Sequence, residues 1–234
     1  GRGDSVAIVA HRSSELVVAL LGVLKAGAAF VIVDPAYPPN RNAACLRSAR
    51  PAAAIVLAQA APAAETLADA LRGALQLRLE RGSIAKLAQT GPRPDVRVQV
   101  GPNERAYIAF TSGTTGAPKG IVGRHGSLTH FVRWQRRQFD LKEADRFSLL
   151  SGLIHDPLHR DIFVPLQTGG AICVPDPELF SDARSLVTWM AEARISVANL
   201  TPSMGRLLCE ALVLEQRPQL SELRYALFVG EALH

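Results

Sequence analysis

The densest concentration of residues able to do chemistry is a loop of glycine, threonine and serine that follows a short apolar run at 107–110. Glycines let the backbone approach a ligand closely, hydroxyl groups donate hydrogen bonds, and a lysine supplies a mobile cation. These residue types in this order predict a cradle for phosphate oxygens. The alternative, a flexible surface turn, does not require so many of them in succession behind a buried strand. The residues assigned to the cradle are Thr111, Ser112, Gly113, Thr114, Thr115, Gly116 and Lys119.

This loop differs from the Walker A loop of many nucleotide-binding proteins. A Walker A loop ends in Gly-Lys followed by serine or threonine. Here Pro118 precedes Lys119 and Gly120 follows it. The sequence therefore predicts a phosphate loop of another kind.

A second group of chemical side chains surrounds Asp156. His155 and His159 are four residues apart with this acid between them, a spacing that resembles the H-E-x-x-H motif of zinc proteases. Pro157 fits poorly inside the helix that such a motif requires, and aspartate is shorter than the glutamate base, so we assign no metal site. Local physics favours a helix start with Asp156 as N-cap and Pro157 as the first helical residue, a role compatible with ligand binding.

Short apolar runs alternate with helical patterns along the chain. This alternation predicts an α/β fold with largely parallel sheets covered by helices on both faces. Between 81 and 102 the apolar period fades among glycines and prolines, so we expect an internal connection there. The expected strands are 6–10, 28–33, 54–57, 77–79, 107–110, 147–150, 171–174, 197–200 and 225–229, and the expected helices include 41–48, 63–75, 127–139, 160–167, 183–193 and 203–212.

The composition excludes several classes of protein. Lysine and arginine number 26 against 21 acidic residues, and 48% of residues are hydrophobic, which suits a folded core and gives no footprint for nucleic acid. The most apolar stretch, 17–33, contains Lys25 and Gly27 and falls short of the roughly 18 unbroken apolar residues of a membrane span. Three widely spaced cysteines suit neither a disulfide framework nor a zinc site. We therefore expect a cytoplasmic protein without nucleic-acid or membrane partners.

The loop at 107–120 resembles the signature loop of the adenylate-forming enzymes, which include acyl-CoA synthetases, luciferases and the adenylation domains of nonribosomal peptide synthetases. Residues 24–38 resemble the second core motif of amino-acid adenylation domains, and residues 3–8 resemble the stretch before it. The resemblance implies that 1–234 is the N-terminal portion of an adenylation domain, without its C-terminal lid subdomain. The resemblance also implies that the catalytic residues lie beyond His234, and we assign none within 1–234. We therefore expect this segment alone to be inactive.

The resemblance also implies a reaction. A carboxylate attacks the α-phosphate of ATP, which gives an acyl-adenylate and pyrophosphate, and the acyl group then passes to a phosphopantetheine thiol on a carrier domain of the same or another chain. The loop would hold the β- and γ-phosphates, Lys119 would offset their charge, and Mg²⁺ would bridge them.

By position in the family, six residues would form the amino-acid pocket. Asp156 falls on the aspartate that pairs with the substrate's α-ammonium group, and the stretch from His155 to Phe163 resembles α-aminoadipate reductases. Arg160 would then pair with a side-chain carboxylate of the substrate. In the alternative, Asp161 or another acid neutralises Arg160 and leaves a pocket for a small amino acid. The six residues are Asp156, Pro157, Arg160, Asn199, Leu227 and Val229.

Two other functions remain open on the sequence. One is activation of a carboxylic acid without an amino group, as in acyl-CoA synthetases, which would make Asp156 purely structural. The other is a non-catalytic adenylate-fold fragment that only binds nucleotides or partners.

Overall fold

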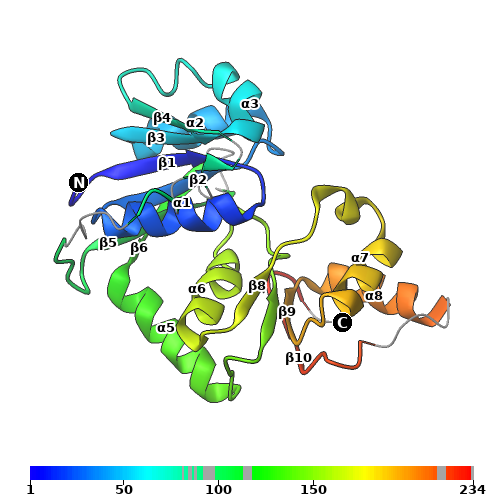
Figure 1. Cartoon of the computed structure of the whole chain (residues 1–234). Coiled ribbons are helices and arrows are strands. Elements are labelled where there is room, and N and C mark those ends of the chain that lie inside the picture. Colours follow the sequence, from blue (N-terminus) through cyan, green and yellow to red (C-terminus); the bar gives the residue numbers. More distant parts are fainter. Residues whose placement is uncertain are drawn as a thin grey trace. The chain divides into compact units, whose positions relative to one another are not determined.

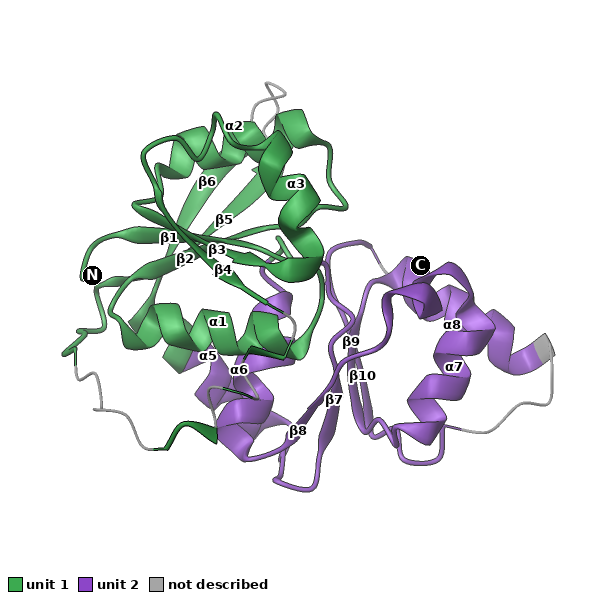
Figure 2. Cartoon of the chain, turned by 45° about the horizontal axis from the view of Figure 1, so that its top comes forward, with its two compact units in different colours: residues 1–129, 153–155 green, residues 130–152, 156–234 purple. Residues whose placement is uncertain are grey.

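The computed structural model describes residues 1–80, 82–83, 86, 89–91, 98–112, 118–214 and 220–232 (Figure 1). The chain forms two compact units (Figure 2). Unit 1 comprises residues 1–129 and 153–155, and unit 2 comprises residues 130–152 and 156–234. Several residues of the connection expected at 81–102 lie outside the described residues.

Unit 1 is built on a six-stranded sheet with the strand order β4-β3-β1-β2-β5-β6. Five of its strands are parallel, and β6 is antiparallel to β5 at the edge. The strands are β1 (Ser5–Val9), β2 (Ala29–Val33), β3 (Ala53–Leu57), β4 (Leu75–Leu79), β5 (Arg105–Ser112) and β6 (Pro118–Arg124).

Helices cover both faces of this sheet (Figure 2). Ala7 and Val31 pack with Leu46 of α2 in one core cluster, while the alternate residue Ile8 is equally buried on the opposite face. Because both faces are covered, the central strands are apolar at nearly every position, as the sequence predicts. The helices of unit 1 are α1 (Ser14–Lys25), α2 (Pro39–Ala49) and α3 (Ala61–Thr66), with a 3₁₀ turn at Ala58–Ala60.

The local sequence explains where α1 begins, but it predicts the wrong length for α3. Ser13 is the N-cap of α1, and its side chain accepts a hydrogen bond from the backbone of Leu16. The helix predicted at 63–75 is wrong in extent, because α3 ends at Thr66 and the chain continues in turns. Alanine-rich composition favours helix locally, but Leu67 already bonds back to Ala64 in the tighter i to i−3 pattern.

Unit 2 contains a four-stranded parallel sheet with the order β10-β9-β7-β8. Figure 2 shows α6 on one side of this sheet and α7 and α8 on the other. The strands are β7 (Arg146–Ser148), β8 (Ala171–Cys173), β9 (Val197–Leu200) and β10 (Tyr225–Phe228). The helices are α5 (His125–Gln138, which begins in unit 1), α6 (Leu158–Thr168), α7 (Ala183–Glu192) and α8 (Pro202–Leu214), with a 3₁₀ segment at Pro177–Ser181.

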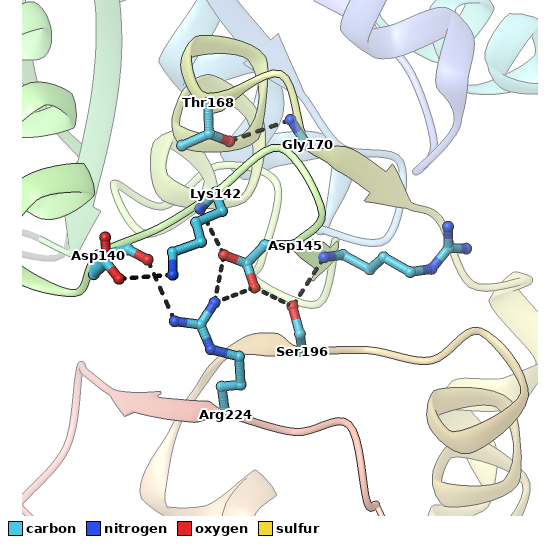
Figure 3. Close-up of polar contacts among 8 residues, drawn as sticks. Asp140, Lys142, Asp145, Thr168, Gly170, Ser196 and Arg224 are labelled. Carbon is cyan, nitrogen blue, oxygen red and sulfur yellow. Dashed lines mark hydrogen bonds and ion pairs between the residues drawn. The ribbon is translucent and has the colours of Figure 1, made fainter.

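One buried carboxylate joins the starts of three strands in unit 2 (Figure 3). Asp145, which is 3% exposed, immediately precedes β7. Its oxygens accept hydrogen bonds from the Ser196 hydroxyl at 2.7 Å and from the Arg224 guanidinium at 2.7 and 2.8 Å. Ser196 immediately precedes β9, and Arg224 immediately precedes β10. The carboxylate therefore fixes the amino ends of these strands relative to one another.

The same contacts decide the ionisation of Asp145. Burial opposes the charged form, but hydrogen bonds from the Lys142 backbone, Ser196 and Arg224 outweigh burial and lower the pKa of Asp145. Because the folded-state pKa lies below the unfolded value of about 3.9, this carboxylate stabilises the fold above that pH. The contribution is lost as the pH falls through the folded-state pKa.

We expect Asp145→Asn to lower the free energy of unfolding by about 3 kcal/mol, because it removes the charge that pairs with Arg224. This is the lower end of the usual range, since the Arg224 side chain is 37% exposed and can be hydrated. Urea denaturation at pH 7 measures the change. Asp182→Asn is the matched control, because Asp182 caps α7 at the surface and asparagine caps equally well. Equal losses in the two variants would contradict the role given to Asp145.

Candidate functional site

The phosphate loop predicted from the sequence connects the two strands of an antiparallel hairpin. Thr111 on β5 is the register partner of Lys119 on β6. Directly opposite residues of an antiparallel pair point to the same face, and both of these residues are exposed. The hairpin therefore presents a hydroxyl group beside an ammonium group, a donor set that fits phosphate oxygens. Ser112 ends β5 opposite Pro118, and Gly113, Thr114, Thr115 and Gly116 lie outside the described residues.

The hairpin corrects the sequence prediction, in which no strand is expected between 107–110 and 147–150. Residues 118–124 form β6, and two of its glycines face aromatic rings of β5. A Cβ atom at Gly120 would lie 3.2 Å from the ring of Phe110, and one at Gly123 would lie 2.0 Å from the ring of Tyr107. Gly120 and Gly123 are therefore required by packing within the sheet.

The start of α6 also differs from the prediction. The helix begins at Leu158, its N-cap is Pro157, and the cap has no side-chain hydrogen bond. The predicted N-cap role of Asp156 is therefore wrong. Pro157 already has helical dihedral angles, and Asp156 contributes only its carbonyl oxygen, which accepts a bond from the His159 backbone at 3.0 Å. Among the described residues nothing donates a hydrogen bond to the exposed Asp156 carboxylate, which leaves it available to a ligand.

Asp161 is fully buried on α6 and joins the helix to its sheet. One of its carboxylate oxygens accepts a hydrogen bond from the Ser151 backbone at 2.8 Å. The other accepts one from the Asn199 amide, also at 2.8 Å. These contacts argue against the alternative in which Asp161 folds onto Arg160. In the sequence prediction, Asp161 is considered only as a possible partner of Arg160. No local sequence pattern indicates that its partners are Ser151 and Asn199.

Arg160 is half-buried, and its guanidinium group lies over the ring of Phe131 on α5, with 5.1 Å between Cζ and the ring centroid. Burial lowers the pKa of Arg160, while the charges of Asp161 and Asp156 act in the opposite direction. An arginine remains charged under such conditions. Arg160 lies in the first turn of α6, four residues after Asp156, so the start of α6 offers one cation and one anion. The sequence prediction misses Phe131, which lies 29 positions earlier in the chain.

The remaining residues of the predicted pocket lie on two adjacent strands or directly after one of them. Asn199 on β9 is 2% exposed and is the register partner of Leu227 on β10. Val229 follows β10, and its backbone donates a hydrogen bond to Leu200 at 3.0 Å. Within unit 2, the contact between Asn199 and Asp161 thus links these strands to the helix whose start carries Asp156, Pro157 and Arg160. The Asn199 side-chain oxygen is buried and has no hydrogen-bond partner among the described residues.

The two histidines near Asp156 lie in different surroundings. Burial lowers the pKa of His159 to about 4, so its ring is neutral at pH 7. The ring nitrogen of His155 lies 3.0 Å from the hydroxyl of Tyr37, and Arg41 stacks on the Tyr37 ring. Among the described residues, no group of three or more His, Cys, Asp or Glu side chains could hold a metal ion. In the same part of the chain, no helix combines the length and the apolar character needed to cross a membrane.

Comparison with known proteins agrees with this arrangement. The sequence profile of the AMP-binding enzyme family matches residues 1–234. L-2-aminoadipate reductase of Schizosaccharomyces pombe is 38% identical over 258 residues, which cover 99% of this chain and 18% of that protein. A linear gramicidin synthase polypeptide of Brevibacillus parabrevis is 35% identical over 237 residues, which cover 100% of this chain and 4% of that protein.

Solved structures confirm the fold. The nonribosomal peptide synthetase FmoA3 with bound alpha-methyl-L-serine-AMP superposes with a TM-score of 0.84 at 27% identity. The superposition covers 100% of this chain and 25% of that one. The chain therefore corresponds to a small part of the much longer proteins that it matches.

Proposed function

Because the chain belongs to the AMP-binding enzyme family, we propose that it supplies the phosphate loop and the amino-acid pocket of a larger ATP-dependent adenylate-forming protein. The first product is an aminoacyl-adenylate, released with pyrophosphate. The acyl group then passes to a phosphopantetheine thiol on a carrier domain. The names of the relatives, a reductase and a peptide synthase, support this function.

The nucleotide site rests on the hairpin of β5 and β6. Lys119 offsets the charge of the β- and γ-phosphates, and the hydroxyl of Thr111 beside it donates to their oxygens. The rest of the site comprises Ser112, Gly113, Thr114, Thr115 and Gly116. Magnesium supplies further charge compensation. Bound Mg²⁺ would supply this charge at the phosphate oxygens of ATP.

We place the amino-acid site at the start of α6. The proposed class of substrate depends on the charge and burial of Arg160. Asp156 pairs with the α-ammonium group of the substrate. The half-buried Arg160 follows four residues later in the first turn of α6, while Asp161 is bonded to Ser151 and Asn199. A side-chain carboxylate pairs with Arg160, whereas an apolar side chain leaves it desolvated without a partner. Leu227, Val229 and Pro157 complete the walls.

We propose a dicarboxylic amino acid such as α-aminoadipate or glutamate as the substrate. The name of the aminoadipate reductase, which matches 99% of this chain, supports that class. The buried oxygen of Asn199 lacks a donor among the described residues, and the substrate ammonium group is one candidate for it. We place the protein in the cytoplasm, where its three free cysteines, Cys45, Cys173 and Cys209, stay reduced.

Exchange of labelled pyrophosphate into ATP, measured on the intact parent protein, tests this proposal. The panel contains α-aminoadipate, glutamate, leucine, alanine and adipate, which lacks the amino group. We expect α-aminoadipate or glutamate to give the highest kcat/KM. A higher value for leucine or alanine would refute the substrate class. Equal values for adipate and α-aminoadipate would assign Asp156 a structural role only, and no exchange with any acid would support a non-catalytic domain.

A further inference from the structure

A line of aromatic side chains in unit 2 leads from Arg160 to the start of β10. The Phe131 ring, under the Arg160 guanidinium, lies 5.8 Å from the Trp134 ring, centroid to centroid. Trp134 meets Phe139 edge to face at 6.1 Å, and Phe139 meets Tyr225 in the same way at 5.4 Å. Offset and edge-to-face pairs at these distances are favourable, so each ring restricts the next.

The far end of this line is anchored by charge. The Arg224 guanidinium stacks on the ring of Tyr225 at 5.2 Å and bonds to the buried carboxylate of Asp145. Phe131 itself is half-buried and lies on the same helix as Trp134, one turn earlier. The ring that contacts Arg160 is therefore a fixed surface.

The stacking contact determines where the Arg160 guanidinium can go. Arginine has a long, flexible side chain, and the nearby Asp156 carboxylate attracts it. No ion pair joins the two in the part of the chain that the structure describes. A guanidinium in cation–π contact with an aromatic face can still donate its N–H groups to a carboxylate. Without the ring, Arg160 could turn toward Asp156, and each group would neutralise the other.

We infer that Phe131 is a positioning residue for substrate selection, because it holds the Arg160 guanidinium away from Asp156 and ready for the side-chain carboxylate of a dicarboxylic amino acid. This inference rests on the proposed function. It adds a residue that does not itself belong to the six pocket positions.

Pyrophosphate exchange on the intact parent protein tests the inference with the variant Phe131→Leu. We expect the KM for α-aminoadipate to rise about 3- to 20-fold, the scale of a lost cation–π contact, with the KM for ATP unchanged. Phe131→Tyr retains the ring and should restore the wild-type KM. Arg133→Ala is the control on the same helix, because the Arg133 side chain is exposed and lies outside the line of aromatic rings, so the KM should change less than about twofold.

A double-mutant cycle separates positioning from a general effect on packing. In the Arg160→Ala background, Phe131→Leu should raise the KM for α-aminoadipate no further. Phe131→Met, which keeps most of the side-chain volume, replaces the leucine variant if thermal melting shows that the latter does not fold.

The outcomes distinguish this inference from the proposed function. If Arg160→Ala leaves the KM for α-aminoadipate unchanged, the proposed substrate class fails, and the inference fails with it. If Arg160→Ala raises that KM but Phe131→Leu does not, only the inference fails. It also fails alone if Phe131→Leu acts equally with and without Arg160, or if Arg133→Ala has the same effect.

Discussion

Replacing Lys119 by alanine in the intact parent protein should lower kcat/KM for ATP by roughly 10- to 1,000-fold, the scale of losing one preorganised electrostatic contact. The lysine lies opposite Thr111, next to the loop that connects β5 and β6, where its exposed ammonium group can meet phosphate oxygens. Because the side chain is exposed, its removal leaves no cavity in the core. We therefore expect the melting temperature to stay within about 2 °C of the wild type.

Steady-state pyrophosphate exchange at varied ATP concentration measures the loss, and thermal melting measures stability. Lys142→Ala is the control, because Lys142 is an exposed lysine whose ammonium pairs with Asp140 in unit 2. That variant should retain the wild-type kcat/KM for ATP. Loss of folding stability in Lys119→Ala with normal ATP kinetics would show that the residue supports the hairpin and not the nucleotide.

Arg160→Ala should lower kcat/KM for the preferred dicarboxylic amino acid by roughly 30- to 1,000-fold, as expected when one partner of a close charge pair is truncated. The effect should appear mainly in the KM for the amino acid, with the KM for ATP unchanged. Discrimination against alanine and leucine should weaken, because these substrates no longer leave a desolvated guanidinium without a partner.

The same exchange assay with glutamate, α-aminoadipate, alanine and leucine measures the change in preference. Arg160→Lys retains the charge but loses the bidentate contact with a carboxylate. Its kcat/KM for the dicarboxylic amino acid should therefore lie between those of Arg160→Ala and the wild type. Arg133→Ala on the exposed face of α5 is the control and should behave as wild type. An unchanged preference and KM in Arg160→Ala would refute the acidic substrate.

The sequence predicts those parts of the fold that local pattern determines. The apolar run at 28–33 corresponds to β2, in which every residue is buried. Residues 118–124 do not alternate, and they contain a proline and two glycines, so local pattern indicates a loop. Their pairing depends on the rings of Phe110 and Tyr107, which a local pattern does not reveal.

The candidate site likewise contains residues that local sequence pattern indicates and residues that it does not. The group around Asp156 is visible because its residues are consecutive, whereas the partners of Asp161 lie 10 and 38 positions away in the sequence. The contact of Phe131 with Arg160 likewise arises from the packing of two helices. Sequence pattern therefore indicates which side chains carry charge, but only the tertiary structure shows which of them are already paired.

The position of the Asp145 carboxylate affects which residues can change when substrate specificity changes. It fixes β7, β9 and β10 at their amino ends, through Ser196 and Arg224. Asn199 and Leu227 are the third residues of their strands, toward the carboxyl ends. In a parallel sheet all amino ends lie at one edge, so the anchoring carboxylate and the proposed pocket residues lie at opposite edges. Evolution or protein engineering can therefore exchange the side chains of the proposed pocket while the alignment of the strands is maintained from the other edge.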